Sequence, residues 1–144
     1  MFSPSFPLNL FGGLQALLLL LVANGAPILA SKLLGKHCSR PIDAGYCMAD
    51  GRRWLGKTKT WRGLVSAACL TAVCTALMNG DFWLGFGFGG LCMIGDFISS
   101  FIKRRLARPE SSHCKGLDTI PETLLPLLVY QNTLEIGFVE TGLI

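Results

Sequence analysis

Charge is scarce in this sequence. Only 15% of its 144 residues are charged and 51% are hydrophobic, whereas a soluble globular domain has about 25% charged residues. The shortage is uneven, because uncharged apolar residues gather in long blocks. The composition therefore disfavours a soluble domain and indicates a chain that lies in a bilayer.

Paired metal-binding motifs are also missing. The six cysteines are scattered over apolar blocks and basic segments without a C-x-x-C pair. This distribution argues against a disulfide framework and against a zinc ribbon. A zinc site that combines the scattered residues remains the alternative, and its candidate ligands would be His37, Cys38, Cys47, His113 and Cys114.

Apolar blocks account for most of the chain, and several approach the roughly 20 residues that cross a bilayer as a helix. We predict spans, including the start of a fifth helix, at residues 10–34, 63–78, 82–104, 118–131 and 136–144. No Lys or Arg precedes the first block, so we interpret it as a mature span and not as a cleaved leader. The predicted fold is one all-α integral-membrane domain over residues 1–144, a bundle of four to five transmembrane helices whose fifth helix is truncated.

The basic residues predict the orientation of this bundle. Eight of the 13 Lys and Arg residues lie between Lys32 and Arg62, and five lie between Lys103 and Lys115. Cytoplasmic loops collect such residues, so we predict cytoplasmic loops at 35–62 and 105–117 with the N-terminus outside. The protein is then a multi-pass protein of the inner (cytoplasmic) membrane. Its net charge of +4 is a local patch that suits phosphates or acidic headgroups, and nothing indicates nucleic acid.

The first basic segment contains GRRWLGKT, residues 51–58, which fits the phosphate-loop pattern G-x-x-x-x-G-K-S/T. A phosphate loop needs a buried strand before its turn and a helix N-terminus after it. The preceding residues have no β-branched run and are broken by Pro41 and Gly45. The inner positions of the match, residues 52–55, are bulky for a tight wrap. We therefore predict that this match is not a P-loop.

The cations of this segment need another explanation. Lys57, Lys59 and Arg62 alternate with Thr58 and Thr60 directly before the second apolar block. One interpretation is an ordinary cluster of positive charge at the inner face of a membrane. The glycines and tryptophans nearby favour a second one, a loop that folds around a polyphosphate. In such a loop Lys acts as a point charge and Arg as a fork.

Asp96 is the single charge between Phe82 and Ile102, the apolar part of the third predicted span. A charged residue inside a span costs at least ~2.5 kcal/mol on insertion scales, which makes it a functional candidate. Ser99, Ser100, Lys103 and Arg104 follow at helical spacings that can share its face. The alternative interpretation is a structural ion pair between Asp96 and one of these cations.

Other polar residues fall at the edges of apolar blocks. Asp118 and Glu122 flank Pro121 at the start of the fourth block, where they either cap a helix or join Asp96 as oxygen ligands of Mg²⁺. In the first block, Asn24 and Pro27 are expected to interrupt the helix. Such a break is tolerated where it faces protein or a polar cavity, and a packing kink is the alternative.

Three strings together, PIDAG…DGRRWLGKTKTWRGL, GDFISSFIKRRL and LDTIPE, resemble the CDP-archaeol synthase family of integral-membrane cytidylyltransferases and its bacterial relatives. The resemblance covers about residues 24–122. It implies an enzyme that activates a membrane lipid phosphate to a CDP-lipid with CTP, releases pyrophosphate and needs Mg²⁺.

By position, the resemblance implies that CTP and the lipid phosphate are bound by Asn24, Lys57, Lys59, Thr60, Arg62, Lys103 and Arg104. It implies catalytic roles for Asp96 and Lys103, with Mg²⁺ held by Asp96, Asp118 and Glu122. The alternatives are a non-catalytic membrane scaffold and an anion transporter with cationic cytoplasmic loops. A scaffold would not need Asp96, and a transporter predicts basic residues within the spans, of which there are none between Arg62 and Lys103.

Overall fold

The computed structural model describes residues 10–35, 37–78, 80–107, 119–131 and 133. These residues form four helices, α1 (Leu10–Leu34), α2 (Trp61–Leu77), α3 (Phe82–Arg105) and α4 (Thr119–Tyr130). Over these ranges there is no strand, only two isolated antiparallel bridges. The all-helical part of the predicted fold is thus confirmed. The predicted fifth stretch and most of the loop at 105–117 lie outside the described residues.

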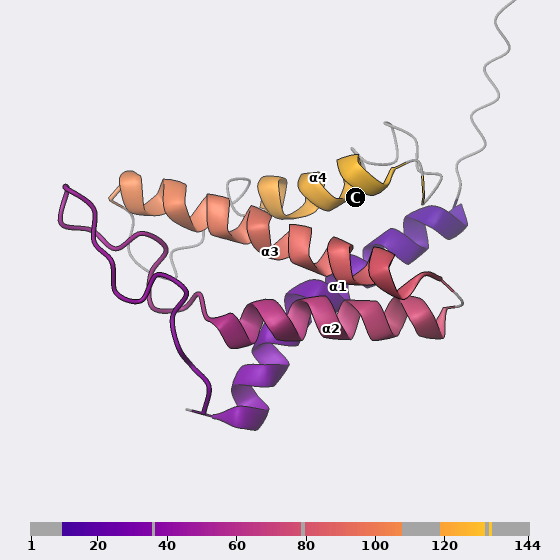
Figure 1. The fold of residues 1–144 in the computed structure, drawn as a ribbon. Helices are drawn as coiled ribbons and strands as arrows, with labels where there is room; N and C mark the ends of the chain where they lie inside the picture. Colours follow the sequence, from indigo (N-terminus) through magenta and orange to yellow (C-terminus); the bar gives the residue numbers. More distant parts are fainter. Residues whose placement is uncertain (1–9, 36, 79, 108–118, 132, 134–144) are drawn as a thin grey trace, which may run out of the picture.

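The helices pack as one bundle. α2 and α3 lie side by side, α4 lies along α3, and α1 crosses behind them at a steep angle (Figure 1). Helices α1, from Phe11 onward, and α3 are long and apolar enough to cross a membrane, while α2 and α4 are shorter apolar helices. Exposed leucines, together with Phe11 and Ile28, cover the outside of α1; Phe11 and Leu21 are each 75% exposed. Such a surface suits lipid chains.

Side-chain caps determine where two of the helices begin. The Thr60 hydroxyl accepts a hydrogen bond from the Gly63 N–H at 3.3 Å, and Asp81 caps α3 by accepting from the Trp83 N–H at 3.1 Å. These bonds satisfy backbone donors that have no partner within the helix. Because of the Thr60 cap, α2 begins two residues before the predicted span. The cationic segment therefore ends directly at a helix N-terminus.

Small residues bring α2 and α3 into close contact. Gly85 and Gly89 are four residues apart on α3 and both face α2. A Cβ added to Gly85 would come 2.8 Å from the Ala72 Cα, and one added to Gly89 would come 2.8 Å from the Ala67 carbonyl oxygen. This spacing of small residues lets membrane helices approach closely.

Gly95 does the same between α3 and α4. A Cβ at this position would come within 2.6 Å of the Glu122 Cα, and would also clash with the Pro121 backbone. The contact places Glu122 beside the turn of α3 that carries Asp96. Two carboxylates that are distant in sequence thus come to the same end of the bundle.

Substitution of Gly95 by Ala should push α4 away from α3. Overpacking of this kind costs about 1–3 kcal/mol, so we expect a lower melting temperature in detergent. Gly90 provides the control, because it lies on the same helix and a Cβ there would meet nothing within 4 Å. Gly90→Ala should leave the melting temperature unchanged or slightly raised. Equal melting temperatures for the two variants would contradict the close contact.

The segment between α1 and α2 folds back on itself as a hairpin beyond the ends of α2 and α3 (Figure 1). Near its base the Ile42 N–H donates to the Lys59 carbonyl at 2.8 Å, and near its tip the Met48 N–H donates to the Arg52 carbonyl at 2.9 Å. We call residues 40–61 the hairpin. Its second arm carries the cationic segment.

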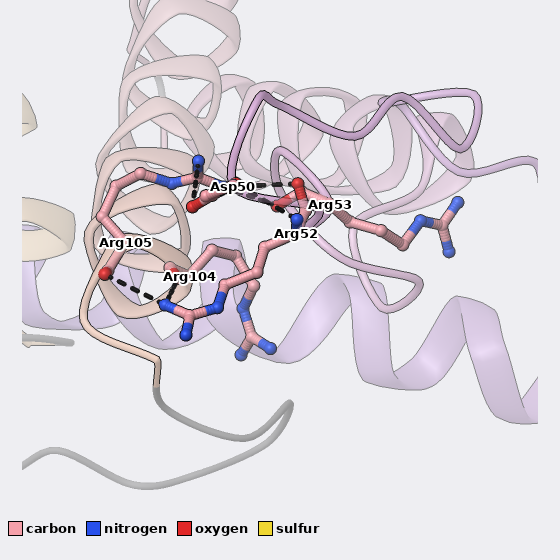
Figure 2. Close-up of polar contacts among 5 residues, drawn as sticks. All are labelled: Asp50, Arg52, Arg53, Arg104 and Arg105. Atoms are coloured by element: carbon pink, nitrogen blue, oxygen red, sulfur yellow. Dashed lines mark hydrogen bonds and ion pairs between the residues drawn. The ribbon is translucent and has the colours of Figure 1, made fainter.

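Arginines fasten the hairpin to the C-terminal end of α3, as Figure 2 shows. Arg52 donates to the carbonyls of Arg104 and Arg105 at 3.4 Å each, and these belong to the last turn, where carbonyls have no partner within the helix. In return, Arg105 donates to the Asp50 carboxylate at 2.8 Å and to the Arg53 carbonyl at 3.0 Å. The hairpin and the end of α3 are therefore held together.

Candidate functional site

A pocket of about 840 Å³ lies where α1, the hairpin, α3 and α4 meet. Its walls come from segments far apart in the sequence. α1 contributes one face with Asn24 and Ser31, the second arm of the hairpin contributes a cationic face, and α3 and α4 contribute the carboxylates Asp96 and Glu122. The pocket thus combines an apolar helix, several cations and two acids.

All but one of the residues that the sequence assigned to the site line this pocket. They are Asn24, Lys57, Lys59, Thr60, Arg62, Asp96, Lys103, Arg104 and Glu122. The exception, Asp118, lies outside the described residues. The structure brings these side chains together, and their individual roles stay predictions.

Asp96 forms an ion pair with Lys59. The Lys59 ammonium lies 2.6 Å and 2.5 Å from the two carboxylate oxygens, and the side chains are only 18% and 23% exposed. The sequence-based alternative named a cation on the same helix as the partner. This ion pair joins α3 to the hairpin, because Lys59 lies on the second arm of the hairpin.

Arg62 has a structural role beside its place in the pocket. Its guanidinium donates to the carbonyls of Gly35 and His37 at 2.9 and 2.8 Å. These groups lie just beyond the end of α1, so Arg62 ties that end to the start of α2. The loss of Arg62 would therefore disturb the pocket wall as well as remove a charge.

The expected interruption of the first helix is wrong. α1 runs as one continuous helix from Leu10 to Leu34 with Pro27 inside it. Proline removes only one intrahelical hydrogen bond, and the ring packs against Gly63 of α2, where an added Cβ would lie 3.4 Å from the Pro27 Cβ. Asn24 and Pro27 nevertheless line the pocket, as the sequence suggested for a helix that faces a polar cavity.

Ser31 and Ser39 also line the pocket, although neither was predicted from the sequence. Ser31 follows Asn24 by seven residues, so helical spacing would have placed it on the same face of α1. Ser39 lies between the helix and the first arm of the hairpin, where no periodic pattern exists. Only the path of the chain brings it to the pocket.

The phosphate-loop match has neither the structure nor the free backbone donors of a P-loop. The described residues before Gly51 form no strand, and α2 begins only at Trp61. The backbone N–H groups of Leu55 and Gly56, which a P-loop would direct at phosphate, donate instead to the Asp43 carboxylate at 3.4 and 3.0 Å. These two backbone donors are therefore already occupied by Asp43.

The purified protein should therefore not hydrolyse ATP or GTP when no lipid is present. The measurement is phosphate release from each nucleotide in detergent, with a Lys57→Ala variant as the matched control. Steady release that disappears in the Lys57→Ala variant would show that the match is a working P-loop.

The carboxylates of the pocket fit a hard cation only together with another ligand. Among the residues that the structure describes, no group of three or more His, Cys, Asp or Glu side chains could hold a metal ion. This also leaves the zinc alternative without a described site; its candidates His113 and Cys114 lie outside the described residues. Asp96 and Glu122 suit Mg²⁺, which commonly takes one or two carboxylates and completes its shell with phosphate oxygens and water.

The fold and the pocket define an all-helical membrane protein with a cationic, carboxylate-containing site at one end of its bundle. Comparison with known proteins then specifies the family. The CarS-like family, described as CDP-archaeol synthase, matches residues 8–82. The chain belongs to this family of CTP:lipid-phosphate cytidylyltransferases, and the resemblance predicted from the sequence is confirmed.

Curated relatives support the same assignment. The CDP-archaeol synthase of Pyrobaculum calidifontis is 36% identical over 114 residues, which are 76% of this chain and 67% of the relative. That of Pyrobaculum aerophilum is 33% identical over 123 residues, 82% of this chain and 73% of the relative. That of Thermococcus onnurineus is 35% identical over 111 residues, 68% of this chain but only 61% of the relative. The chain thus spans about two thirds of the length of these relatives.

A solved structure agrees with these sequences. It is described as an intramembrane enzyme for archaeal membrane lipid biosynthesis, and its chain is 26% identical to this one. The TM-score is 0.76, with 93% of this chain and 85% of that chain covered. A membrane protein is therefore supported by a fold neighbour as well as by composition.

Proposed function

We propose that this protein transfers a cytidylyl group from CTP to a membrane lipid phosphate, which yields a CDP-lipid and pyrophosphate. One observation supports this function above the others: the residues predicted for it, from four separate segments, converge on one pocket in a member of the CDP-archaeol synthase family. A scaffold would not need that convergence. An anion transporter would need cations along the spans, and α2 has none after Arg62.

The chemistry needs no protein nucleophile. An oxygen of the lipid phosphate attacks the α-phosphorus of CTP, and the bond from that phosphorus to the β-phosphate oxygen breaks. Positioning and neutralisation of charge supply most of the catalysis in such a transfer. Lys57, Lys59 and Thr60 would bind the CTP phosphates from the hairpin, while Lys103 and Arg104 would oppose charge from α3.

The two substrates would reach the pocket from different sides. Ile28 lines the pocket and is 58% exposed on the outside of α1, so the lipid chains would lie against this helix. The hairpin borders the opposite, cationic side, from which CTP would enter. Asn24 and Ser31 lie on the α1 wall, where their polar groups would meet the lipid phosphate.

Mg²⁺ is the proposed cofactor, with Asp96, Glu122 and Asp118 as its carboxylate ligands. When bound, Mg²⁺ would neutralise charge on the phosphates. Lys59 holds the Asp96 carboxylate at the pocket wall and so keeps it where a phosphate-bound cation would meet it. We also propose that both basic segments face the cytoplasm with the N-terminus outside, because positive residues gather on that side.

The test is CDP-lipid formation by purified protein. CTP and Mg²⁺ are supplied with an ether-linked or an ester-linked lipid phosphate, and the CDP-lipid and pyrophosphate are quantified together. We expect equal amounts of the two products with at least one lipid, and neither product with CTP alone. If both lipids give no CDP-lipid, the proposed function is wrong.

A further inference from the structure

Asp43 is a buried carboxylate that the proposed chemistry does not use. It lies in the first arm of the hairpin, its side chain is 0% exposed, and it does not line the pocket. Burial of a charge is unfavourable unless the charge is paired and hydrogen-bonded. The contacts of Asp43 therefore indicate its role in the hairpin.

Four donors converge on this carboxylate. One oxygen accepts from the Gly45 N–H and from the Arg53 guanidinium, both at 3.1 Å. The other accepts from the N–H groups of Gly56 and Leu55, at 3.0 and 3.4 Å. Asp43 thus joins the two arms of the hairpin from within.

These contacts keep Asp43 ionised. Burial by itself would raise the pKa of Asp43, but the hydrogen bonds from Gly45, Gly56 and Leu55 and the nearby Arg53 charge together lower it below the ordinary value. A lowered pKa means that the carboxylate contributes stability above its pKa in the unfolded chain, and that this is lost as the pH falls through its folded pKa. The ionised Asp43 carboxylate therefore stabilises the hairpin throughout the neutral pH range.

Leu55 and Gly56, which donate to Asp43, directly precede the proposed phosphate-binding residues. Gly56 has a φ of 102°, which strongly favours glycine, and Lys57 follows it. On the other side, the Lys59 carbonyl accepts from the N–H of Ile42, the neighbour of Asp43, at 2.8 Å. Lys57, Thr58 and Lys59 are therefore held at both ends by two adjacent residues of the first arm.

We propose that Asp43 is the positioning residue of the CTP-binding segment: its carboxylate holds Leu55 and Gly56 so that Lys57, Thr58 and Lys59 face the pocket. This inference rests on the proposed function for its catalytic consequence, but not for its structural one. Asp43 acts through the hairpin and need not touch substrate.

The kinetic test compares Asp43→Asn with Asp50→Asn. Asp50 lies in the same hairpin, accepts from the Arg52 N–H and pairs with Arg105, but does not line the pocket. We expect kcat/KM for CTP to fall at least about tenfold in Asp43→Asn, mainly through KM, since misplacement by ~1 Å can cost about 100-fold. The KM for the lipid phosphate should change less than about twofold, and Asp50→Asn should stay close to wild type. If Asp43→Asn lowers kcat but leaves the KM for CTP unchanged, Asp43 only stabilises the fold and the proposal is wrong.

The structural test is amide hydrogen exchange of the peptide that contains Leu55 to Lys59, in detergent without substrate. Asp43→Asn should speed exchange there and leave α2 and α3 protected, whereas Asp50→Asn should not. Should Asp43→Asn fail to fold, Arg53→Gln removes one donor to the same carboxylate and should give a smaller change in the same direction. Unchanged exchange in both variants would overturn the positioning role. If the wild type forms no CDP-lipid, the proposed function is wrong. The exchange result then still tests whether Asp43 positions Leu55 to Lys59.

Discussion

Replacement of Asp96 by Asn is expected to reduce CDP-lipid formation at least about 100-fold, a magnitude typical for loss of one preorganised electrostatic group in an active site. The substitution preserves size and removes the charge that pairs with Lys59. A neutral amide is a far weaker partner for Mg²⁺, which prefers anionic oxygen. The measurement is the Mg²⁺ dependence of CDP-lipid formation in wild type and variant, with helical content by circular dichroism as the folding control.

A double-mutant cycle with Lys59→Met separates the two possible roles of Asp96. If Asp96 only neutralises Lys59, the double variant should regain the melting temperature that Asp96→Asn loses, because no unpaired charge remains, and Asp96→Asn should keep much of its activity. If Asp96 acts on the phosphates through a cation, Asp96→Asn should stay folded and be nearly inactive. Equal rates of wild type and Asp96→Asn at equal Mg²⁺ would remove Asp96 from the mechanism.

Lys59→Ala should lower kcat/KM for CTP by about 10- to 100-fold, because a hydrogen bond to a charged group contributes ~1.5–3 kcal/mol. Lys32 supplies a matched control. It is an exposed cation in the last turn of α1 and is not part of the pocket wall. Lys32→Ala should keep kcat/KM for CTP within about twofold of wild type, since exposed charges interact weakly through solvent.

Steady-state kinetics with CTP as the varied substrate distinguish the interpretations of the cationic segment. If both Lys variants lose activity equally, the segment acts only through net positive charge at the membrane face. If neither changes the kinetics for CTP, Lys59 does not bind the nucleotide. The ionic strength is held constant, because salt screens exposed charges more than partly buried ones.

The described helices could be predicted from the sequence because their signals are local. Uncharged runs as long as a bilayer is thick indicate α1 and α3, and Thr60 and Asp81 are good capping residues in the positions where α2 and α3 begin. The motifs that carry the family resemblance also lie on short segments. Residue types and spacing were therefore enough to nominate Lys59 and Asp96, and both line the pocket.

The tertiary structure alone decided how these segments meet. A carboxylate on α3 can pair with any cation that the fold brings near, and the path of the hairpin brings Lys59 to Asp96. The packing of Pro27 against Gly63 of α2 likewise joins segments that are distant in the sequence. The burial of Asp43 depends on both arms of the hairpin. Contacts of this kind arise from packing between distant segments, which no local pattern of residues encodes.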